Sequence, residues 1–326
     1  MRSAASIVVT RGKLTFPTSS EKLFGRDAPL AAEIGVGSGQ FIERLSESHP
    51  EWNVLGIDRA PDSIVRTFRR LQNAGAENAR LMKADATFVL RDVIPRHGLH
   101  AIYVNFPDPW PRRKHRDRRL LQAPLLELIS IRLEDGGKLF LTSDHPEFFA
   151  QVCANAADSG LFRIEERDPP PETLETKYAR KWRNQELDIF HAELIKTCEA
   201  DENSGHDDGQ AVTIEIEKGM HHAVLKGELP DLSEFQKLIF SFRRSTIVVL
   251  EAYRPLDASG YAFLVHVEER GLSQEVIIEA RQGKNGYVVG LKRFGEPLQT
   301  RGIRHAVRCL TEWLEGHGMT VIHRKY

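Results

Sequence analysis

Residues 31–41 have the sequence AAEIGVGSGQF, which is the clearest local signal of the fold in this chain. It starts with small apolar residues, passes through a turn with three glycines at alternate positions, and continues into a segment with the apolar spacing of a helix. Glycines between a strand and a helix let the backbone turn tightly and approach a bound molecule closely. The stretch therefore predicts a strand, a turn and a helix, with a ligand site at the carboxyl end of the strand.

Segments typical of strands and of helices alternate through the first two hundred residues. The strand-like segments are residues 31–35, 52–58, 78–85, 100–106 and 136–144, followed after a further helix by 162–167 and 187–196. Alternation at this spacing is typical of right-handed crossover units, in which helices cover both faces of a parallel sheet. The first part of the chain is therefore predicted to be an α/β domain.

A change of composition divides the chain into two domains. Residues 198–210 hold five acidic residues and two glycines but no Lys or Arg, which is typical of a linker. Residues 1–197 form the α/β domain in this interpretation. Residues 211–326 change to short strands and two predicted helices, at 230–243 and 299–316, and form a smaller α+β domain.

The composition is that of an ordinary globular protein and indicates a cytoplasmic location. Hydrophobic residues make up 41% and charged residues 28% of the 326 residues. No run approaches the roughly 18 apolar residues that span a bilayer, and the N-terminus lacks the pattern of an export signal. The three cysteines lie far apart, which is typical of free thiols in a reducing compartment, and no residues have the spacing of a metal site.

The charges are unevenly distributed along the chain. Residues 112–119, RRKHRDRR, hold six Lys/Arg and one Asp, a net charge of +5 in a chain whose total is −1. A single basic segment in a mildly acidic protein indicates a local binding surface. By itself the segment does not distinguish a nucleic-acid contact from a solvated surface, so the residues next to it decide the interpretation.

Three acidic residues stand at the ends of three successive predicted strands. Glu33 precedes the glycine turn by two residues, Asp58 ends the second strand, and Asp85 ends the third. Dinucleotide-binding turns have the pattern GxGxxG, whereas GxGxG after an acid, here with Gly35 and Gly37, is typical of S-adenosylmethionine (SAM) methyltransferases. Carboxylates at these places suit ribose hydroxyls, an adenine amino group and a positive sulfonium, but they would repel a pyrophosphate. The sequence therefore predicts SAM as the cofactor rather than NAD.

The end of the fourth predicted strand carries the sequence NFPDPWP, residues 105–111. Its three prolines restrict the backbone, which would hold a side chain in one position at little cost in entropy. Asp108 is thereby placed beside the methyl donor, and Trp110 offers a flat surface against which a base could stack. The basic segment 112–119 follows directly, where phosphates next to an extruded base would lie.

FPDPW followed by a basic segment with the pattern H-x-x-R-R resembles the tRNA (guanine-N7)-methyltransferase family. The resemblance covers roughly residues 15–197 and includes the segments EIGVGSG, GID, ADA and RRKHRDRRL. It implies a class I SAM-dependent methyltransferase, which is a Rossmann-like α/β fold with a mostly parallel seven-stranded sheet. It also implies an activity, the transfer of the SAM methyl group to N7 of the guanine at position 46 (m7G46) in the variable loop of tRNA.

The resemblance assigns roles to residues by their positions in the family's motifs. It implies that Asp108 is the catalytic residue and that the cofactor is bound by Glu33, Gly35, Gly37, Asp58, Asp85 and Asn105. It further implies substrate binding by Arg112, Asp144, Thr176, Lys177 and Tyr178, and RNA binding by Lys114, His115, Arg116, Arg118 and Arg119. The family pattern T-x-[YF]-E is incomplete here, because Ala179 stands in the place of the glutamate.

Two other functions are compatible with parts of the sequence. A SAM methyltransferase acting on another substrate would keep the strand-end acids but would not need the basic segment. A tRNA-binding protein without catalytic activity would fit the presence of Ala179, but not the retention of Asp108. The sequence predicts tRNA as the partner, with no membrane and no metal, and leaves open whether the protein is a monomer or a homodimer. For residues 211–326 it leaves open a role in packing or dimerisation and an accessory tRNA contact.

Overall fold

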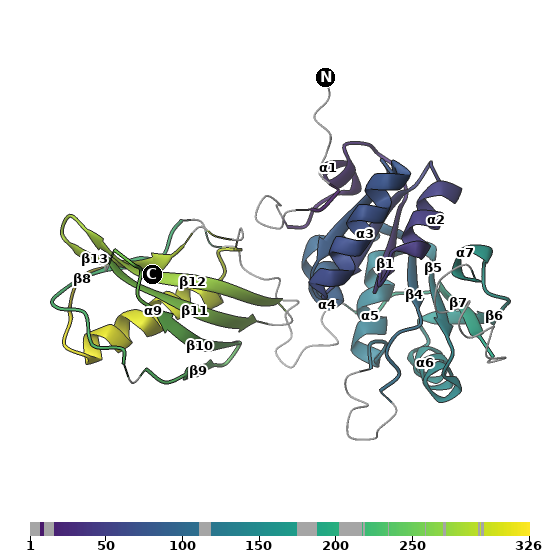
Figure 1. Cartoon of the computed structure of the whole chain (residues 1–326). Coiled ribbons are helices and arrows are strands. Elements are labelled where there is room, and N and C mark those ends of the chain that lie inside the picture. The colour runs from purple at the N-terminus through teal and green to yellow at the C-terminus, as the bar shows by residue number, and fades with distance from the viewer. Residues whose placement is uncertain are drawn as a thin grey trace. The chain divides into compact units, whose positions relative to one another are not determined.

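The structure is a computed structural model of the chain (Figure 1). It describes residues 7–9, 16–110, 119–174, 188–201, 217, 219–233, 235–257, 259–269, 272–292, 294 and 297–326. The described residues form two compact units, one before residue 212 and the other from there to the C-terminus. Within these ranges, no helix is both long enough and apolar enough to cross a membrane.

One sheet runs through the described part of the first unit (Figure 1). Its seven strands are β1 (Leu30–Ile34), β2 (Asn53–Asp58), β3 (Ala79–Lys83), β4 (Leu99–Asn105), β5 (Leu133–Ser143), β6 (Phe162–Glu166) and β7 (Phe190–Lys196). They lie in the order β3-β2-β1-β4-β5-β7-β6, in which β1 to β5 are parallel and β7 is antiparallel to both of its neighbours. This confirms the predicted α/β fold with a mostly parallel seven-stranded sheet. The strand order reverses between β1 and β4, which is where open α/β sheets bind their ligands.

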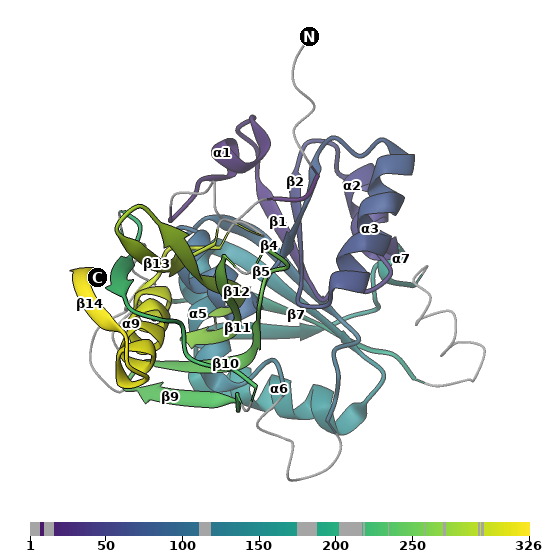
Figure 2. The same ribbon diagram turned by 60° about the vertical axis from the view of Figure 1, so that its left-hand side comes forward.

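Helices cover both faces of this sheet, as the alternation of segments predicts. After the short α1 (Ser20–Phe24), one face carries α2 (Gln40–Ser48), α3 (Pro61–Ala74) and α7 (Pro171–Leu174) (Figure 2). The other face carries α5 (Ala123–Arg132) and α6 (Pro146–Ser159). The π-helix η2 (Val89–Val93), which follows α4 (Ala86–Phe88), contacts α5.

The sequence of α3 explains where this helix begins and ends. Pro61 stands in its first turn, where the fixed φ of proline suits a helix and the missing N–H is not needed. Gly75 ends it in the left-handed conformation, with φ 67°. The buried residues of α3, among them Ile64 and Leu71, recur on one side of the helix, and this side packs on the sheet.

The central strands are buried, so their polar groups gather at one edge of the sheet. Every residue of β1 is buried, and in β2 only the last residue, Asp58, is partly exposed. Near-continuous apolar strands are expected where helices cover both faces of a parallel sheet. Because parallel strands end at the same edge, the residues that follow β1, β2, β3 and β4 meet there.

The second unit is an α+β unit with a core of its own. Its strands are β8 (His222–Lys226), β9 (Leu238–Phe242), β10 (Ser245–Tyr253), β11 (Gly260–Glu269), β12 (Leu272–Gly283), β13 (Gly286–Leu291) and β14 (Thr320–Lys325). Among the described residues they form an antiparallel sheet in the order β14-β8-β13-β12-β11-β10-β9. The helix α9 (Arg301–Gly316) packs on one face, where Ile303, Val307 and Leu310 join the buried cluster.

One predicted helix of the second unit is wrong. The predicted helix 230–243 ends instead in β9, which pairs with β10 in antiparallel register. In the sequence LIFSF of β9, Ile239 and Ser241 are exposed while the residues on either side of them are partly buried. This alternation of exposed and buried residues has the period of a strand. The apolar residues before β9 have the spacing of a helix, but the pairing of β9 with β10 favours the strand.

Candidate active site

A cavity of about 810 Å³ lies at the carboxyl edge of the first sheet. Four turns line it, represented by Gly35 after β1, Asp58 at the end of β2, Asp85 after β3 and Asp108 after β4. The four strands are neighbours in the sheet, so turns that are distant in the sequence surround one space. All the predicted cofactor residues line this cavity: Glu33, Gly35, Gly37, Asp58, Asp85 and Asn105.

The turn after β1 has a positive φ at each of its three glycines, Gly35, Gly37 and Gly39. Gly37 has φ 52°, and its N–H donates to Asp58 Oδ2 at 3.1 Å, which ties the turn to the end of β2. Gly39 has φ 76°, and a Cβ there would lie 2.7 Å from Cγ2 and Oγ1 of Thr67 in α3. The turn is therefore shaped both by its bond to the neighbouring strand and by the close approach of α3.

Glu33 and Asn105 are polar residues in the wall of the cavity. Glu33 is 2% exposed, and burial together with the negative charge of Asp58 raises the pKa of Glu33 to about 8. Oε2 of Glu33 and both amide atoms of Asn105 are buried and form no hydrogen bond of good geometry among the described residues, although Asn105 lies near enough to Glu33 to lower its pKa slightly against these two effects. Buried polar groups are normally paired. These atoms therefore fit a ligand that carries a positive charge and hydrogen-bonding groups, as the methionine part of SAM does.

Backbone N–H groups hold the carboxylates of Asp58 and Asp85 in place. Asp58 Oδ1 accepts a hydrogen bond from the N–H of Ala60 at 2.8 Å, and Asp85 Oδ1 accepts one from the N–H of Thr87 at 2.8 Å. A carboxylate oxygen can accept more than one hydrogen bond, so both groups still fit the ribose hydroxyls and the adenine amino group. Arg59 also lines the cavity, with Nη1 3.5 Å from Asp85 Oδ2. The sequence patterns do not predict this role of Arg59, although the residue directly follows Asp58 at the end of β2.

The turn after β4 presents Asp108 from a restricted backbone. Asp108 is exposed and stands between two prolines, which have no N–H groups. Phe106 and Trp110, on either side of this Pro-Asp-Pro sequence, have φ values of 51° and 41°. Residues other than glycine rarely adopt positive φ and keep it where surrounding contacts hold them. Trp110 lines the same cavity as Asp108, which is compatible with its predicted role as a stacking surface.

Arg119 does not have the position predicted for an RNA contact. Its side chain is 1% exposed, its Nε donates to the carbonyl oxygen of Pro109 at 2.8 Å, and its Nη1 donates to Gln151 of α6. A guanidinium buried to this extent has almost no surface to offer to a phosphate. The charge pattern could not reveal this, because a buried arginine and an exposed one contribute equally to a basic segment.

The other predicted binding residues lie outside this cavity or outside the described residues. Asp144 stands between β5 and α6 and is not among the residues that line the cavity. Outside the described ranges lie Arg112, Lys114, His115, Arg116, Arg118, Thr176, Lys177, Tyr178 and Ala179. In the part of the chain that the structure describes, no group of three His, Cys, Asp or Glu residues is arranged to hold a metal ion.

Comparisons with known proteins match this chain to methyltransferases. The family model Methyltransf_4, with the description "Putative methyltransferase", matches residues 27–192. The tRNA (guanine-N(7)-)-methyltransferase of Thermus thermophilus is 38% identical over 94% of this chain and 96% of that protein. The protein of the same name from Deinococcus radiodurans is 40% identical over 97% of this chain and 98% of its own length.

Relatives of this name differ in how much of the chain they match. That of Syntrophotalea carbinolica is 33% identical over 55% of this chain and 79% of its own length, whereas the two above match the second unit as well. The cofactor of this chain is SAM, and the groups that line the cavity fit it. The chain is a SAM-dependent methyltransferase and belongs to the tRNA (guanine-N(7)-)-methyltransferase family.

Proposed function

We propose that this protein transfers the methyl group of SAM to N7 of the guanine at position 46 in the variable loop of tRNA. The observation that carries the proposal is the position of Asp108, on a restricted turn that lines the same cavity as Glu33, Asp58 and Asp85. The relatives from Thermus thermophilus and Deinococcus radiodurans, which match nearly the whole chain, are named for the same base and the same atom. A cytoplasmic location would bring the protein together with tRNA.

The residues of the cavity divide between the two ends of the cofactor. Asp58 and Asp85 accept hydrogen bonds from the ribose hydroxyls and the adenine amino group, while Glu33 and Asn105 bind the methionine end. When bound, SAM supplies a methyl group on a positively charged sulfur. Glu33 faces this charge as a carboxylate whose other electrostatic neighbour, Asp58, is also negative. This pair of acids therefore favours the cationic cofactor over its neutral demethylated product.

Asp108 acts on the guanine through its Watson–Crick edge. N7 carries an in-plane lone pair at neutral pH, so no base has to remove a proton before the displacement. Asp108 accepts hydrogen bonds from N1–H and the exocyclic amino group, which makes N7 more nucleophilic. The same carboxylate stabilises the positive charge that develops on the purine as the methyl group arrives. Alignment of N7 with the methyl group contributes about 7–11 kcal/mol of barrier reduction in favourable cases.

The remaining predicted residues complete the substrate site in this proposal. Arg112, Asp144, Thr176, Lys177 and Tyr178 bind the guanine and its nucleotide. Lys114, His115, Arg116 and Arg118 contact the tRNA backbone. Removal of one phosphate contact should lower the slope of tRNA affinity against salt concentration by about one unit. Because Ala179 stands where the family pattern has a glutamate, another group completes the guanine contacts in this proposal.

Methyl transfer from labelled SAM tests the proposed function. The substrate is an unmodified tRNA transcript with guanine at position 46, and the control transcript differs only by adenine at that position. We expect label in the first transcript and none in the second. Equal labelling of both transcripts, or none in either, would contradict the proposal. Label in a protein or a small molecule would instead identify a methyltransferase with another substrate, and tRNA binding without transfer would identify a catalytically silent binding protein.

A further inference from the structure

Arg119 is a fully enclosed cation beside the turn that carries Asp108. The whole residue is 2% exposed, and each of the three guanidinium nitrogens has a polar partner. Nε donates to Pro109 O at 2.8 Å, Nη1 donates to Gln151 Oε1, and Nη2 lies 3.5 Å from Glu147 Oε1. The guanidinium carbon also lies 5.9 Å from the ring centre of Phe148. Arg119 therefore joins two parts of the structure, the turn after β4 and the first turns of α6.

Backbone restriction and hydrogen bonds on both sides of Asp108 shape the turn after β4. Pro107 and Pro109 cannot donate backbone hydrogen bonds, and the residues before and after them have positive φ. The N–H of Phe106 donates to Thr142 O of β5 at 2.8 Å, which fixes the start of the turn. The bond from Arg119 to Pro109 O lies on the far side of Asp108. Asp108 therefore lies between a hydrogen bond to the sheet and a hydrogen bond to Arg119, which is itself bound to α6.

The contacts of Arg119 distinguish a positioning role from general packing. A charged group taken out of water is retained where partners satisfy it, and a planar guanidinium can meet several partners with fixed geometry. Here its partners are a backbone carbonyl next to the proposed catalytic residue and side chains of a single helix. A change in this arrangement would move Asp108 relative to the cofactor without touching the residues that bind the cofactor.

We propose that Arg119 is a positioning residue for catalysis, which holds Asp108 in its reactive place by binding Pro109 and α6, and that it does not contact tRNA phosphates. The inference rests on the proposed function for the role of Asp108. Misplacement of a reacting group by about 1 Å lowers a rate by about 100-fold. Loss of the arginine is therefore expected to act on kcat, and not on the affinity for SAM or on the salt dependence of tRNA binding.

Three variants of the full chain test this role. Arg119→Met removes all the polar contacts and should lower kcat for tRNA methylation by about 100-fold. Its SAM Kd and the salt slope of its tRNA affinity should stay those of the wild type. Arg119→Lys can bind Pro109 O through Nζ and should recover part of kcat. Arg163→Met, which removes an exposed arginine of β6, serves as the control and should leave kcat unchanged.

Hydrogen exchange provides a readout that does not depend on the reaction. In the ligand-free protein, the amides of Phe106, Asp108 and Trp110 should exchange faster in Arg119→Met than in the wild type or in Arg163→Met. If Arg119→Met fails to fold, Gln151→Ala, which removes one partner of the guanidinium, should show a smaller change of kcat and of exchange in the same direction.

The results separate this inference from the proposed function. If the wild type methylates tRNA while Arg119→Met keeps its kcat and its exchange rates, the positioning role is wrong. If Arg119→Met lowers the slope of tRNA affinity against salt by about one unit but leaves kcat unchanged, Arg119 contacts a tRNA phosphate instead. If the wild type transfers no methyl group to tRNA, the proposed function fails by itself. The exchange rates still decide whether Arg119 holds the turn.

Discussion

Glu33 is a carboxylic acid near the carboxyl end of β1, a strand whose other residues are apolar and buried. Its pKa is raised to about 8, first by burial and then by the negative charge of Asp58. In the ligand-free protein Glu33 therefore carries its proton below about pH 8. A bound sulfonium and ammonium would favour the charged form, because an opposite charge nearby lowers the pKa of a carboxyl group.

Binding of SAM is accordingly expected to release a proton from Glu33. Between pH 6 and 7 the release should approach one proton, and the affinity for SAM should rise by up to about tenfold per pH unit. Calorimetric titrations in two buffers with different ionisation enthalpies measure the number of protons released. Glu33→Gln, which cannot ionise, should remove this release. An equal number of protons in wild type and variant would contradict the assignment of Glu33 to the cofactor's cationic end.

Asp108 is expected to act on the reaction and not on cofactor binding. Asp108→Asn keeps the shape of the side chain but removes its negative charge. It should lower kcat by about 100- to 1000-fold, which is the size of effect seen when one electrostatic contact to a transition state is lost. The SAM Kd, measured by calorimetry, should stay within about threefold of the wild type. Asp62→Asn, which changes an exposed acid in the first turn of α3, is the matched control. Near-normal turnover of Asp108→Asn would overturn the assignment.

At the scale of elements, the glycine turn after β1 combines a conformational requirement with a packing requirement. Gly39→Ala would place a Cβ 2.7 Å from Thr67, and its φ of 76° is unfavourable for alanine as well. Gly75 ends α3 with φ 67°, but no atom lies within 4 Å of a Cβ built there. Gly75→Ala therefore introduces the same backbone strain without the steric contact.

The comparison of these two variants isolates the contact between the turn and α3. Gly39→Ala should lower the free energy of unfolding by about 1–3 kcal/mol more than Gly75→Ala, since overpacking of a close contact has this cost. Urea denaturation of both variants measures the difference. Equal losses of stability in the two variants would mean that α3 moves away from the added Cβ at little cost. Gly39 would then be required only for its positive φ.

The elements of the first unit could be predicted because several local signals agree. Small or apolar runs mark β1 and β2, acids mark their carboxyl ends, and Pro61 and Gly75 mark the ends of α3. The strand β9 could not be predicted in this way, because exposed and partly buried residues alternate over only five residues. Its pairing with β10, which favours the strand, is a contact that no local pattern shows.

The candidate site could be predicted as far as it depends on strand ends. Glu33, Asp58, Asp85 and Asp108 follow from the rule that parallel strands present their ends at one edge. The burial of Arg119 depends on contacts with α6, and the requirement for glycine at position 39 depends on Thr67 in α3. Contacts between residues this far apart in the sequence leave no local pattern.

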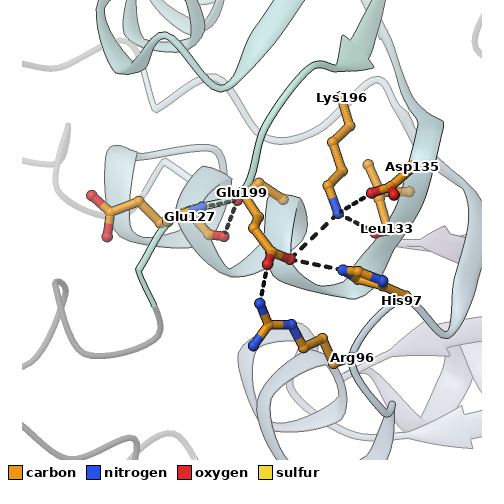
Figure 3. A network of polar contacts seen from close by, with 9 residues as sticks. Arg96, His97, Glu127, Leu133, Asp135, Lys196 and Glu199 are labelled. Atoms are coloured by element: carbon orange, nitrogen blue, oxygen red, sulfur yellow. Dashed lines mark hydrogen bonds and ion pairs between the residues drawn. The ribbon is translucent and has the colours of Figure 1, made fainter.

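In the molecule as a whole, the last described residues of the first unit lie in a network of charged residues (Figure 3). Glu199 forms an ion pair with Arg96 and lies 2.8 Å from His97 Nε2 and 3.6 Å from Lys196 Nζ. Lys196, with a side chain that is 2% exposed, donates to Leu133 O at 2.8 Å. The N–H of Ala200 donates to Ser130 Oγ at 3.0 Å. These contacts attach residues 199 and 200 to the sheet of the first unit and to α5.

Glu199 should make the stability of the first unit sensitive to acid. Hydrogen bonds from His97 and Arg96 lower the pKa of Glu199 from 4.5 to about 2. A carboxyl group whose pKa is lower in the folded state stabilises the protein above its unfolded pKa, and this contribution is lost as the pH falls from about 4.5 to 2. Glu199→Gln should therefore be less stable than the wild type at pH 6 and should lose less stability over that acid range.

Thermal unfolding between pH 6 and 2 checks this prediction. Glu47→Gln is the control, because Glu47 pairs with Arg44 on the exposed side of α2, where an ion pair contributes little. The control should follow the wild type at every pH. The same pH dependence in Glu199→Gln and wild type would show that the network does not hold the end of the unit.

The position and the atom that receive the methyl group decide whether the protein is a guanine-N7 methyltransferase of the tRNA variable loop. A tRNA transcript is incubated with the full-length protein and SAM, and aniline scission then maps 7-methylguanine along the chain. We predict one scission, at the guanine of position 46, that is present with the wild type and absent or strongly reduced with Asp108→Asn. Methyl transfer to the tRNA without scission at position 46 would show that the protein modifies another position or another atom.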